Sequence, residues 1–145
     1  MELSSSAFEN YQPIPDAHTH KGAGVHPPLS LTSVPPGTQS LAIILHDPDA
    51  IKPDFVHWVI WNISATTTLI PENHIPAGAT QGVNDGKQQN YMPPSPPSGT
   101  HHYVFDLYAL NCELPIGETA NADQLLSAMQ GHIIAQAQLV GTVSA

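Results

Sequence analysis

Arginine is absent from this 145-residue chain, and the only lysines are Lys21, Lys52 and Lys87. Twelve acidic residues bring the net charge to −9 at pH 7. Proteins that bind nucleic acid need a basic surface, and proteins that bind anionic membranes need clusters of lysine or arginine. The composition excludes surfaces of both kinds. We therefore expect no affinity for nucleic acid.

Cysteine and long apolar runs are also scarce. The single cysteine, Cys112, has no partner for an internal disulfide, which fits a reducing compartment. No apolar run approaches the roughly 20 residues of a transmembrane helix. The first fifteen residues lack the basic start and apolar core of a signal peptide. We expect one domain, residues 1–145, in a cytoplasmic protein that does not insert into membranes.

Two apolar runs joined by a polar turn form the centre of the expected fold. Leu41 to Leu45 is continuously apolar, and Phe55 to Ile63 is rich in β-branched and aromatic residues. Both runs predict strands. The second is apolar on both faces, which predicts a central strand covered on both sides. Simple alternation places these residues on one face of it: Phe55, His57, Val59, Trp61 and Ile63.

The turn between these strands, His46-Asp47-Pro48-Asp49, gathers polar groups at the end of the sheet. Proline fixes φ and the carboxylates favour a turn, while His57 enters the next strand close by. Asp-Pro-Asp is also a common turn sequence, and a histidine on an apolar face is often a buried, hydrogen-bonded one. Taken alone, this segment is more simply explained as a turn and a buried histidine than as a binding site.

An upstream group of histidines raises the question of a metal. His18 and His20 form a His-x-His pair, and His26 follows. The spacing offers no fourth ligand, and the segment is predicted to be loop, so we expect no metal there. Ile14-Pro15 is the expected beginning of an edge strand.

A long loop leads to a third buried strand. Residues 64–99 are rich in turn-forming residues, and a loop of this length is usually functional or disordered. Prolines at 93, 94, 96 and 97 favour a fixed conformation. The next run, 101–110, alternates between two faces and places His101 and Tyr103 on the same one. Histidine thus stands at the entrance of a buried strand for the second time.

The best helical pattern covers residues 121–138. Asn121 or Asp123 is the expected cap, and the apolar stripe consists of Leu125, Leu126, Met129 and Ile133. Gly131 is a possible interruption. We expect the closing residues to return to the sheet in extended form.

Seven motifs occur in an order that is characteristic. They are Pro27-Pro28-Leu29, the run Pro35 to Leu41, Asp47-Pro48-Asp49-Ala50, His57 to Asn62, Gly82-x-Asn84, Tyr91, and Pro96-Pro97-x-Gly99 before His101-x-Tyr103. Together they resemble the phosphatidylethanolamine-binding protein family, also known through the Raf kinase inhibitor proteins. The resemblance is greatest to its compact bacterial and archaeal branch, of the YbhB and YbcL type.

This resemblance implies a mainly β fold, in which a large antiparallel sheet and a smaller second sheet form a sandwich-like core with one or two peripheral helices. It also implies a small anion-binding pocket without metal or cofactor. Carried over by motif, the polar residues of the pocket are Asp47, Asp49, His57, His101 and Tyr103. The loop that closes around it carries Tyr91, Pro96, Pro97 and Gly99.

Several departures from the family pattern affect this pocket. Ile51 replaces a proline, Pro93 replaces a glycine that would offer a backbone donor, and His102 replaces an arginine. Leu31 stands where a tryptophan is usual. These changes bear on ligand identity more than on fold.

The expected function is non-enzymatic binding of a phosphate or phosphoethanolamine type of head group. Histidine and tyrosine donors suit phosphate oxygens, and an aspartate can hold a histidine in its donating form or accept from an ammonium. The resemblance adds possible regulation of a kinase or other protein partner, and a homodimer is possible. Two alternatives stay open. One is a hydrolase with His57 or His101 as the base, and the other is a surface-acting protein with a vestigial pocket.

Overall fold

The computed structural model describes every residue from Met1 to Ala145 and is mainly β, as expected. Six strands form the large sheet, in the order β2-β9-β8-β4-β5-β7. They are β2 (Gln12–Pro13), β4 (Ser40–Asp47), β5 (Phe55–Ser64), β7 (Thr80–Gln81), β8 (Thr100–Leu110) and β9 (Ile133–Ser144). Neighbours are antiparallel except β2, which runs parallel to β9. The three strands predicted from apolar runs therefore lie side by side as β8, β4 and β5.

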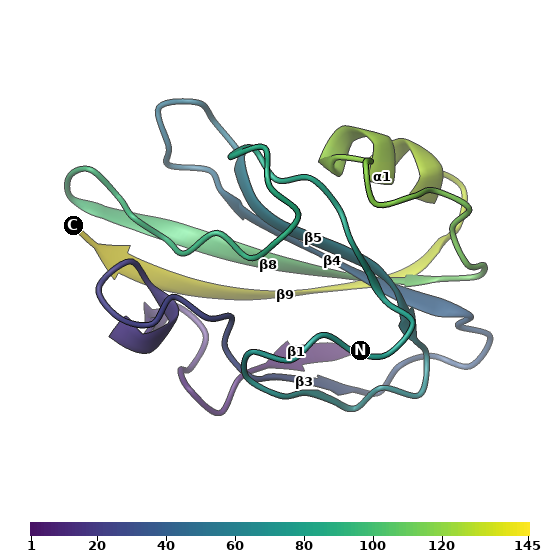
Figure 1. Cartoon of the computed structure of the whole chain (residues 1–145). Helices are drawn as coiled ribbons and strands as arrows, with labels where there is room; N and C mark the ends of the chain where they lie inside the picture. Colours follow the sequence, from purple (N-terminus) through teal and green to yellow (C-terminus); the bar gives the residue numbers. More distant parts are fainter.

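The smaller sheet packs on one face of the large one. It consists of β1 (Glu2–Ser4), β3 (Leu29–Thr32) and β6 (Leu69–Ile70), in the order β1-β3-β6. Helix α1 (Ala122–Met129) covers the opposite face, as Figure 1 shows. A 3-10 turn, η1 (Asp16–His18), lies in the N-terminal segment. The expected two-sheet architecture with a peripheral helix is confirmed.

Each face of the large sheet has its own apolar core. Trp58 and Trp61, both fully buried, point to opposite faces. The core under the smaller sheet includes Leu29, Leu41, Leu45, Trp58, Ile60, Tyr103, Phe105 and Leu107. The core under α1 includes Ala42, Ile44, Val59, Trp61, Leu110, Leu125 and Met129. Coverage on both sides explains why the central strands are apolar on both faces.

Simple alternation along β5 is wrong, because two irregularities interrupt its pairing with β4. The partner of Leu45 is Trp58 and that of His46 is Val56, so His57 is an extra residue in a bulge. A second bulge lies near Asn62, whose φ is 54°. Phe55 and His57 consequently share a face with Trp58, Ile60 and Ile63, while Val59 and Trp61 point to the helix side.

The helix predicted over 121–138 is too long. Asn121 caps α1 with a complete capping box, because its side chain accepts from Gln124 N–H and Gln124 returns a hydrogen bond. The helix ends at Met129, and Gly131 follows with a φ of 81°. Ile133, assigned to the helical stripe, instead begins β9. No helix in the protein has the length and apolarity required to cross a membrane.

Candidate anion-binding site

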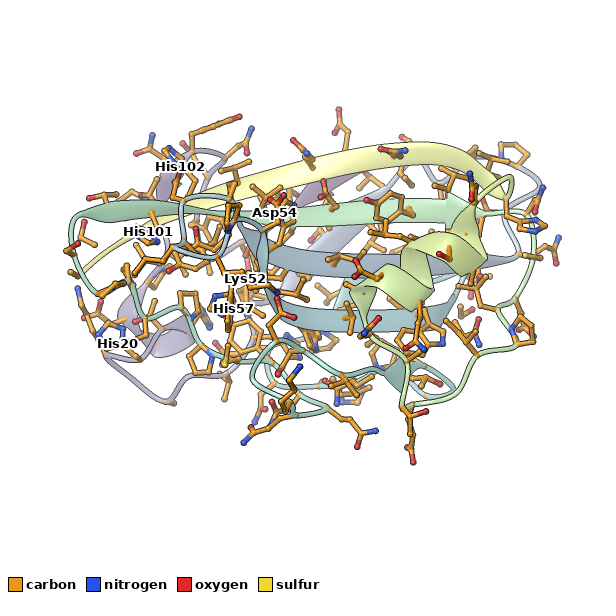
Figure 2. The ribbon with its side chains drawn as sticks, turned by 90° about the horizontal axis from the view of Figure 1, so that it is seen from above. His20, Lys52, Asp54, His57, His101 and His102 are labelled. Carbon is orange, nitrogen blue, oxygen red and sulfur yellow. The ribbon has the colours of Figure 1, made fainter.

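The antiparallel sheet brings three polar side chains to one end of its central strands. Asp47 is the last residue of β4, and both neighbours of β4 begin at that end. His57 therefore enters on β5 and His101 enters on β8, one on each side of β4. Figure 2 shows the two histidines near Lys52 at the end of the sheet away from the body of α1. Residues more than forty positions apart in sequence meet here because of strand order.

A cavity of about 490 Å³ opens at this end of the sheet. Six of the nine residues expected at the pocket line it: Asp47, His57, Pro96, Pro97, His101 and Tyr103. The other three, Asp49, Tyr91 and Gly99, do not line it. The binding role of all nine stays a prediction, but their positions now divide them into two groups.

Asp47 and His101 form the polar floor. Asp47 is buried, and its Oδ2 atom accepts from His101 Nδ1 at 2.7 Å. Its other oxygen accepts from the Asp49 backbone N–H at 2.8 Å, which closes the turn after β4. Both oxygens of Asp47 are therefore hydrogen-bonded, and His101 Nε2 has no protein partner.

The same turn directs Asp49 away from the cavity. Its Oδ2 atom accepts from both the backbone N–H and the Nδ1 of His102, each at 2.7 Å. These two hydrogen bonds lower the pKa of Asp49 below its ordinary value. Asp49 thus joins the turn to the outer face of β8.

His57 is held by a reciprocal pair of bonds with Met92. Its Nδ1 donates to the Met92 carbonyl at 2.8 Å, and the Met92 N–H donates to the His57 carbonyl at 2.9 Å. Burial lowers the pKa of His57, so the ring favours its neutral form. Since Nδ1 carries the proton, Nε2 is left as a lone pair without a protein partner.

Tyr103 completes the polar floor. Its ring lies edge-on to His57, with centroids 5.3 Å apart, and only 1% of the residue is exposed. Burial, together with the nearby charge of Asp47, raises the pKa of Tyr103 far above its ordinary value. The phenol therefore keeps its proton and remains a donor.

Residues 92–99 are here called the proline loop. Tyr91, which does not line the cavity, anchors the start of this loop to the rest of the protein. Its hydroxyl donates to the His18 carbonyl at 2.7 Å, and its ring packs against Trp58. His20 holds the Pro94 carbonyl through both its backbone N–H and its Nδ1 at 3.0 Å. The N-terminal segment thus braces the proline loop through hydrogen bonds at His18 and His20.

The upstream histidines have main-chain partners. His18 Nδ1 bonds the Val25 carbonyl, and His26 bonds the carbonyl of Pro27 and the backbone of His74. His26 also stacks on Trp58 at 4.8 Å. No group of three or more histidine, cysteine or acidic residues is arranged to hold a metal ion.

Sequence reasoning missed most of the outer wall of the cavity. Ile51 and Pro93 were recognised as departures from the family pattern that affect the pocket, and the wall residues that were not predicted are Ala50, Lys52, Phe55, Met92 and Ser95. Lys52 is its only lysine, and its amine pairs with Asp85 at 2.6 Å while lying 5.8 Å from the Phe55 ring centre. These residues lie in the turn after β4, at the first position of β5 and in the proline loop. The available signal was that each of these two loops leads into a strand with a histidine near its start.

This arrangement suits recognition of an anion. Protonated His57 and His101 can each donate through Nε2, and Tyr103 adds a hydroxyl donor. The carboxylate of Asp47 is already hydrogen-bonded, which reduces its repulsion of an incoming negative group. The same His101–Asp47 pair also has the geometry of a base and its orienting carboxylate.

Comparison with known proteins identifies relatives over nearly the whole chain. A family model described as phosphatidylethanolamine-binding protein matches residues 4–144. The UPF0098 protein of Chlamydia muridarum is 40% identical, over 98% of this chain and 97% of that protein. The UPF0098 protein of Methanothermobacter thermautotrophicus is 41% identical, over 97% of each chain. LppC of Mycobacterium tuberculosis, which is named as a lipoprotein, is 38% identical over 98% of this chain and 71% of that protein.

Solved structures agree with these relatives. A phosphatidylethanolamine-binding protein homologue from Chlamydia trachomatis superposes with a TM-score of 0.95 and 39% identity, covering 99% of this chain and 97% of that chain. YbcL of E. coli, described as a member of the mammalian family, has a TM-score of 0.93 and 27% identity, covering 99% and 98%. The chain belongs to the phosphatidylethanolamine-binding protein family.

Proposed function

We propose that the protein binds a small anion of the phosphate or phosphate-ester type in this cavity, without chemical transformation. The observation that carries the proposal is a pair of histidines on neighbouring strands whose Nδ1 atoms are engaged and whose Nε2 atoms have no protein partner. These two histidines, His57 and His101, line the same cavity as the buried Tyr103. A histidine Nε2 that carries a proton and the Tyr103 hydroxyl can each give an anion a directional hydrogen bond in a protein that has no arginine.

The second part of the proposal is that occupancy regulates a protein partner, a kinase or another signalling protein by family resemblance. Ile51 and Pro97 at the rim are exposed, so a bound ligand would alter the surface that a partner meets. A cytoplasmic location is also proposed. It is supported by the single, half-exposed Cys112 and the absence of any disulfide.

Titration calorimetry with inorganic phosphate at pH 6 tests the anion site. His101→Gln removes the ring Nε2 atom from the cavity, and we expect at least a tenfold loss of affinity. The adjacent His102→Gln is the matched control, because His102 lies on the opposite face of β8 and outside the cavity. Its affinity should stay within about twofold of wild type. Absence of heat from millimolar phosphate in the wild-type protein would refute the proposal.

A second candidate function is hydrolysis of a phosphate ester, and the His101–Asp47 contact of 2.7 Å favours it. His101 would act as the general base on a water, with Asp47 orienting the ring. Steady release of p-nitrophenol from p-nitrophenyl phosphate, lost in His101→Gln and retained in His102→Gln, would support this function. Tight binding of the ester without release supports the non-enzymatic one.

A further inference from the structure

One edge of the large sheet is open along the first half of β9. The only strand beside β9 on its outer side is β2, and it pairs with Gly141 and Thr142 alone. Figure 2 shows β9, in yellow, along one border of the large sheet. Residues 134–138, here called the open segment, have β8 on one side and no strand on the other.

The main chain of the open segment directs hydrogen-bonding groups outward. Val140, the nearest covered residue, accepts from the Tyr11 N–H at 2.6 Å and donates its own N–H to Asn10 Oδ1 at 2.8 Å. Val140 therefore faces away from β8. In an antiparallel ladder alternate residues face the same edge, so Gln138 and Gln136 also present their N–H and C=O groups away from β8. Main-chain groups in this arrangement form a template for one more strand.

The open segment lacks the features that keep exposed strands from pairing. Charged side chains and proline protect the edge strands of many proteins. The open segment, Ile-Ala-Gln-Ala-Gln, contains neither. A bulge in the pairing with β8 displaces only its first residue, Ile134. The edge is therefore competent to add a strand.

Exposed apolar side chains lie near both ends of the open segment. Tyr11 borders its end and Ile134 stands at its beginning, with exposed fractions of 59% and 43%. Leu126 of α1, which is 44% exposed, shares a cavity with Tyr108, the partner of Gln136 on β8. A stable dimer buries roughly 800 Å² on each partner, and these side chains extend the area that a strand edge alone provides.

The charge of this region suits a second copy of the same chain. Two molecules of net charge −9 repel each other wherever their carboxylates meet. Residues 132–144 contain no acidic side chain, so two copies can approach along β9. The one carboxylate of β8, Asp106, faces Gln138 in the ladder and is hydrogen-bonded to His46 at 2.8 Å.

We propose that β9 pairs edge to edge with β9 of a second copy, in antiparallel register centred on Gln136, and joins the two large sheets into one continuous sheet. The run 135–137, Ala-Gln-Ala, reads the same in both directions, so each copy meets its own pattern across the two-fold axis. The two Gln136 residues exchange both main-chain hydrogen bonds, and Gln138 faces Ile134 of the second copy.

This interface leaves the anion cavity open. His101, which lines the cavity, pairs with Val143 near the end of β9, whereas Gln136 lies in its first half. The inference therefore goes beyond the proposed anion binding and does not depend on it.

Sedimentation velocity of the whole chain, from micromolar to millimolar concentration, tests the proposal. We expect the wild-type protein to change from one chain to two as the concentration rises. Gln136→Lys places like charges opposite each other at the two-fold axis and should raise the Kd of the dimer at least tenfold. Gln39→Lys is the matched control, because Gln39 is exposed in the loop before β4, which β8 separates from β9. It should dimerise as the wild type does.

Hydrogen exchange locates the interface directly. The outward N–H groups of Gln136 and Gln138 should exchange rapidly at micromolar concentration and become protected at millimolar concentration. The N–H of Ala137, which faces β8, should be protected at both concentrations and serves as the internal control.

Two outcomes would overturn the proposal. A wild-type protein that remains a single chain at millimolar concentration would leave the open segment to a strand of another protein. Dimers equally stable in Gln136→Lys and Gln39→Lys would mean that the copies meet through a different surface. Neither result depends on whether the cavity binds an anion.

Discussion

At the scale of single residues, His57 connects anion binding to proton uptake. Its Nδ1 donates to the Met92 carbonyl, and burial lowers the pKa of the ring. In the empty cavity Nε2 is therefore a lone pair, which repels an anion. An anion that accepts a hydrogen bond from Nε2 requires the protonated ring, so binding raises the pKa of His57.

We predict that affinity for diethyl phosphate rises as the pH falls. The free pKa lies below 6.5 and the bound pKa lies above the free one, so the rise is confined to the interval between them. One linked proton gives at most about tenfold per pH unit. A diester keeps one negative charge throughout, so its own ionisation does not interfere. Calorimetry between pH 5 and 8 measures the effect.

His57→Gln should remove most of this pH dependence, because an amide can still donate to Met92 but does not titrate. His132→Gln is the control, since His132 is exposed and bonds Asn111 far from the cavity. Equal affinity at both ends of the range in the wild-type protein would mean that His57 does not take up a proton on binding.

How far individual site residues could be predicted depended on their backbone context. The family resemblance placed Asp47, His57, His101 and Tyr103 in one pocket, and the structure brings these four to one cavity because each stands near the end of a buried strand. Asp49 was assigned to the same pocket but does not line the cavity. The hydrogen bond from its own N–H to Asp47 turns its side chain toward His102, and period-two reasoning does not extend into a turn.

At the scale of elements, the sequence predicted the three central strands well and the segment after them less well. Apolar runs on both faces are a strong signal for β4, β5 and β8. The bulge that adds His57 left no signal, because alternation assumes regular pairing. The helix was extended too far because Ile133 fits a helical stripe as well as a strand, and Gly131, with its positive φ, separates the two.

We predict that Gly82→Ala destabilises the protein by about 1–3 kcal/mol, the usual effect of overpacking a filled site. A Cβ atom at this position would lie 2.3 Å from the Trp61 ring and 2.5 Å from the Ala120 carbonyl oxygen. Gly82 is bonded to β5 through the Val59 carbonyl, so the loop cannot easily move away. Gly117→Ala is the control, because a Cβ there meets nothing within 4 Å. Equal urea midpoints for both variants would contradict this packing.

At the scale of the whole molecule, three histidines make the free energy of unfolding depend on pH, and His46 acts in the opposite direction to His26 and His57. His46 lies between Asp106 at 2.8 Å and Asp54 at 3.0 Å, and the hydrogen bond to Asp106 is the main cause of its raised pKa. Burial lowers the pKa of His26 and His57. The contribution of His46 to the free energy of unfolding is fully present below the pKa that His46 has in the unfolded chain. It is lost as the pH rises through the higher pKa of the folded protein. For His26 and His57, stability is complete above the unfolded pKa and declines as the pH falls toward the folded value.

The free energy of unfolding should therefore reach its maximum near the ordinary histidine pKa of 6.5 and decline on both sides. The alkaline decline is reinforced by self-repulsion, because a net charge of −9 is no longer offset by protonated histidine. Urea unfolding at pH 5, 6.5 and 8.5 measures the curve. His46→Gln should flatten the alkaline side and leave the acid side, while His132→Gln should follow wild type. An alkaline slope that survives in His46→Gln would assign that decline to overall charge, with no contribution from the Asp54–His46–Asp106 contact.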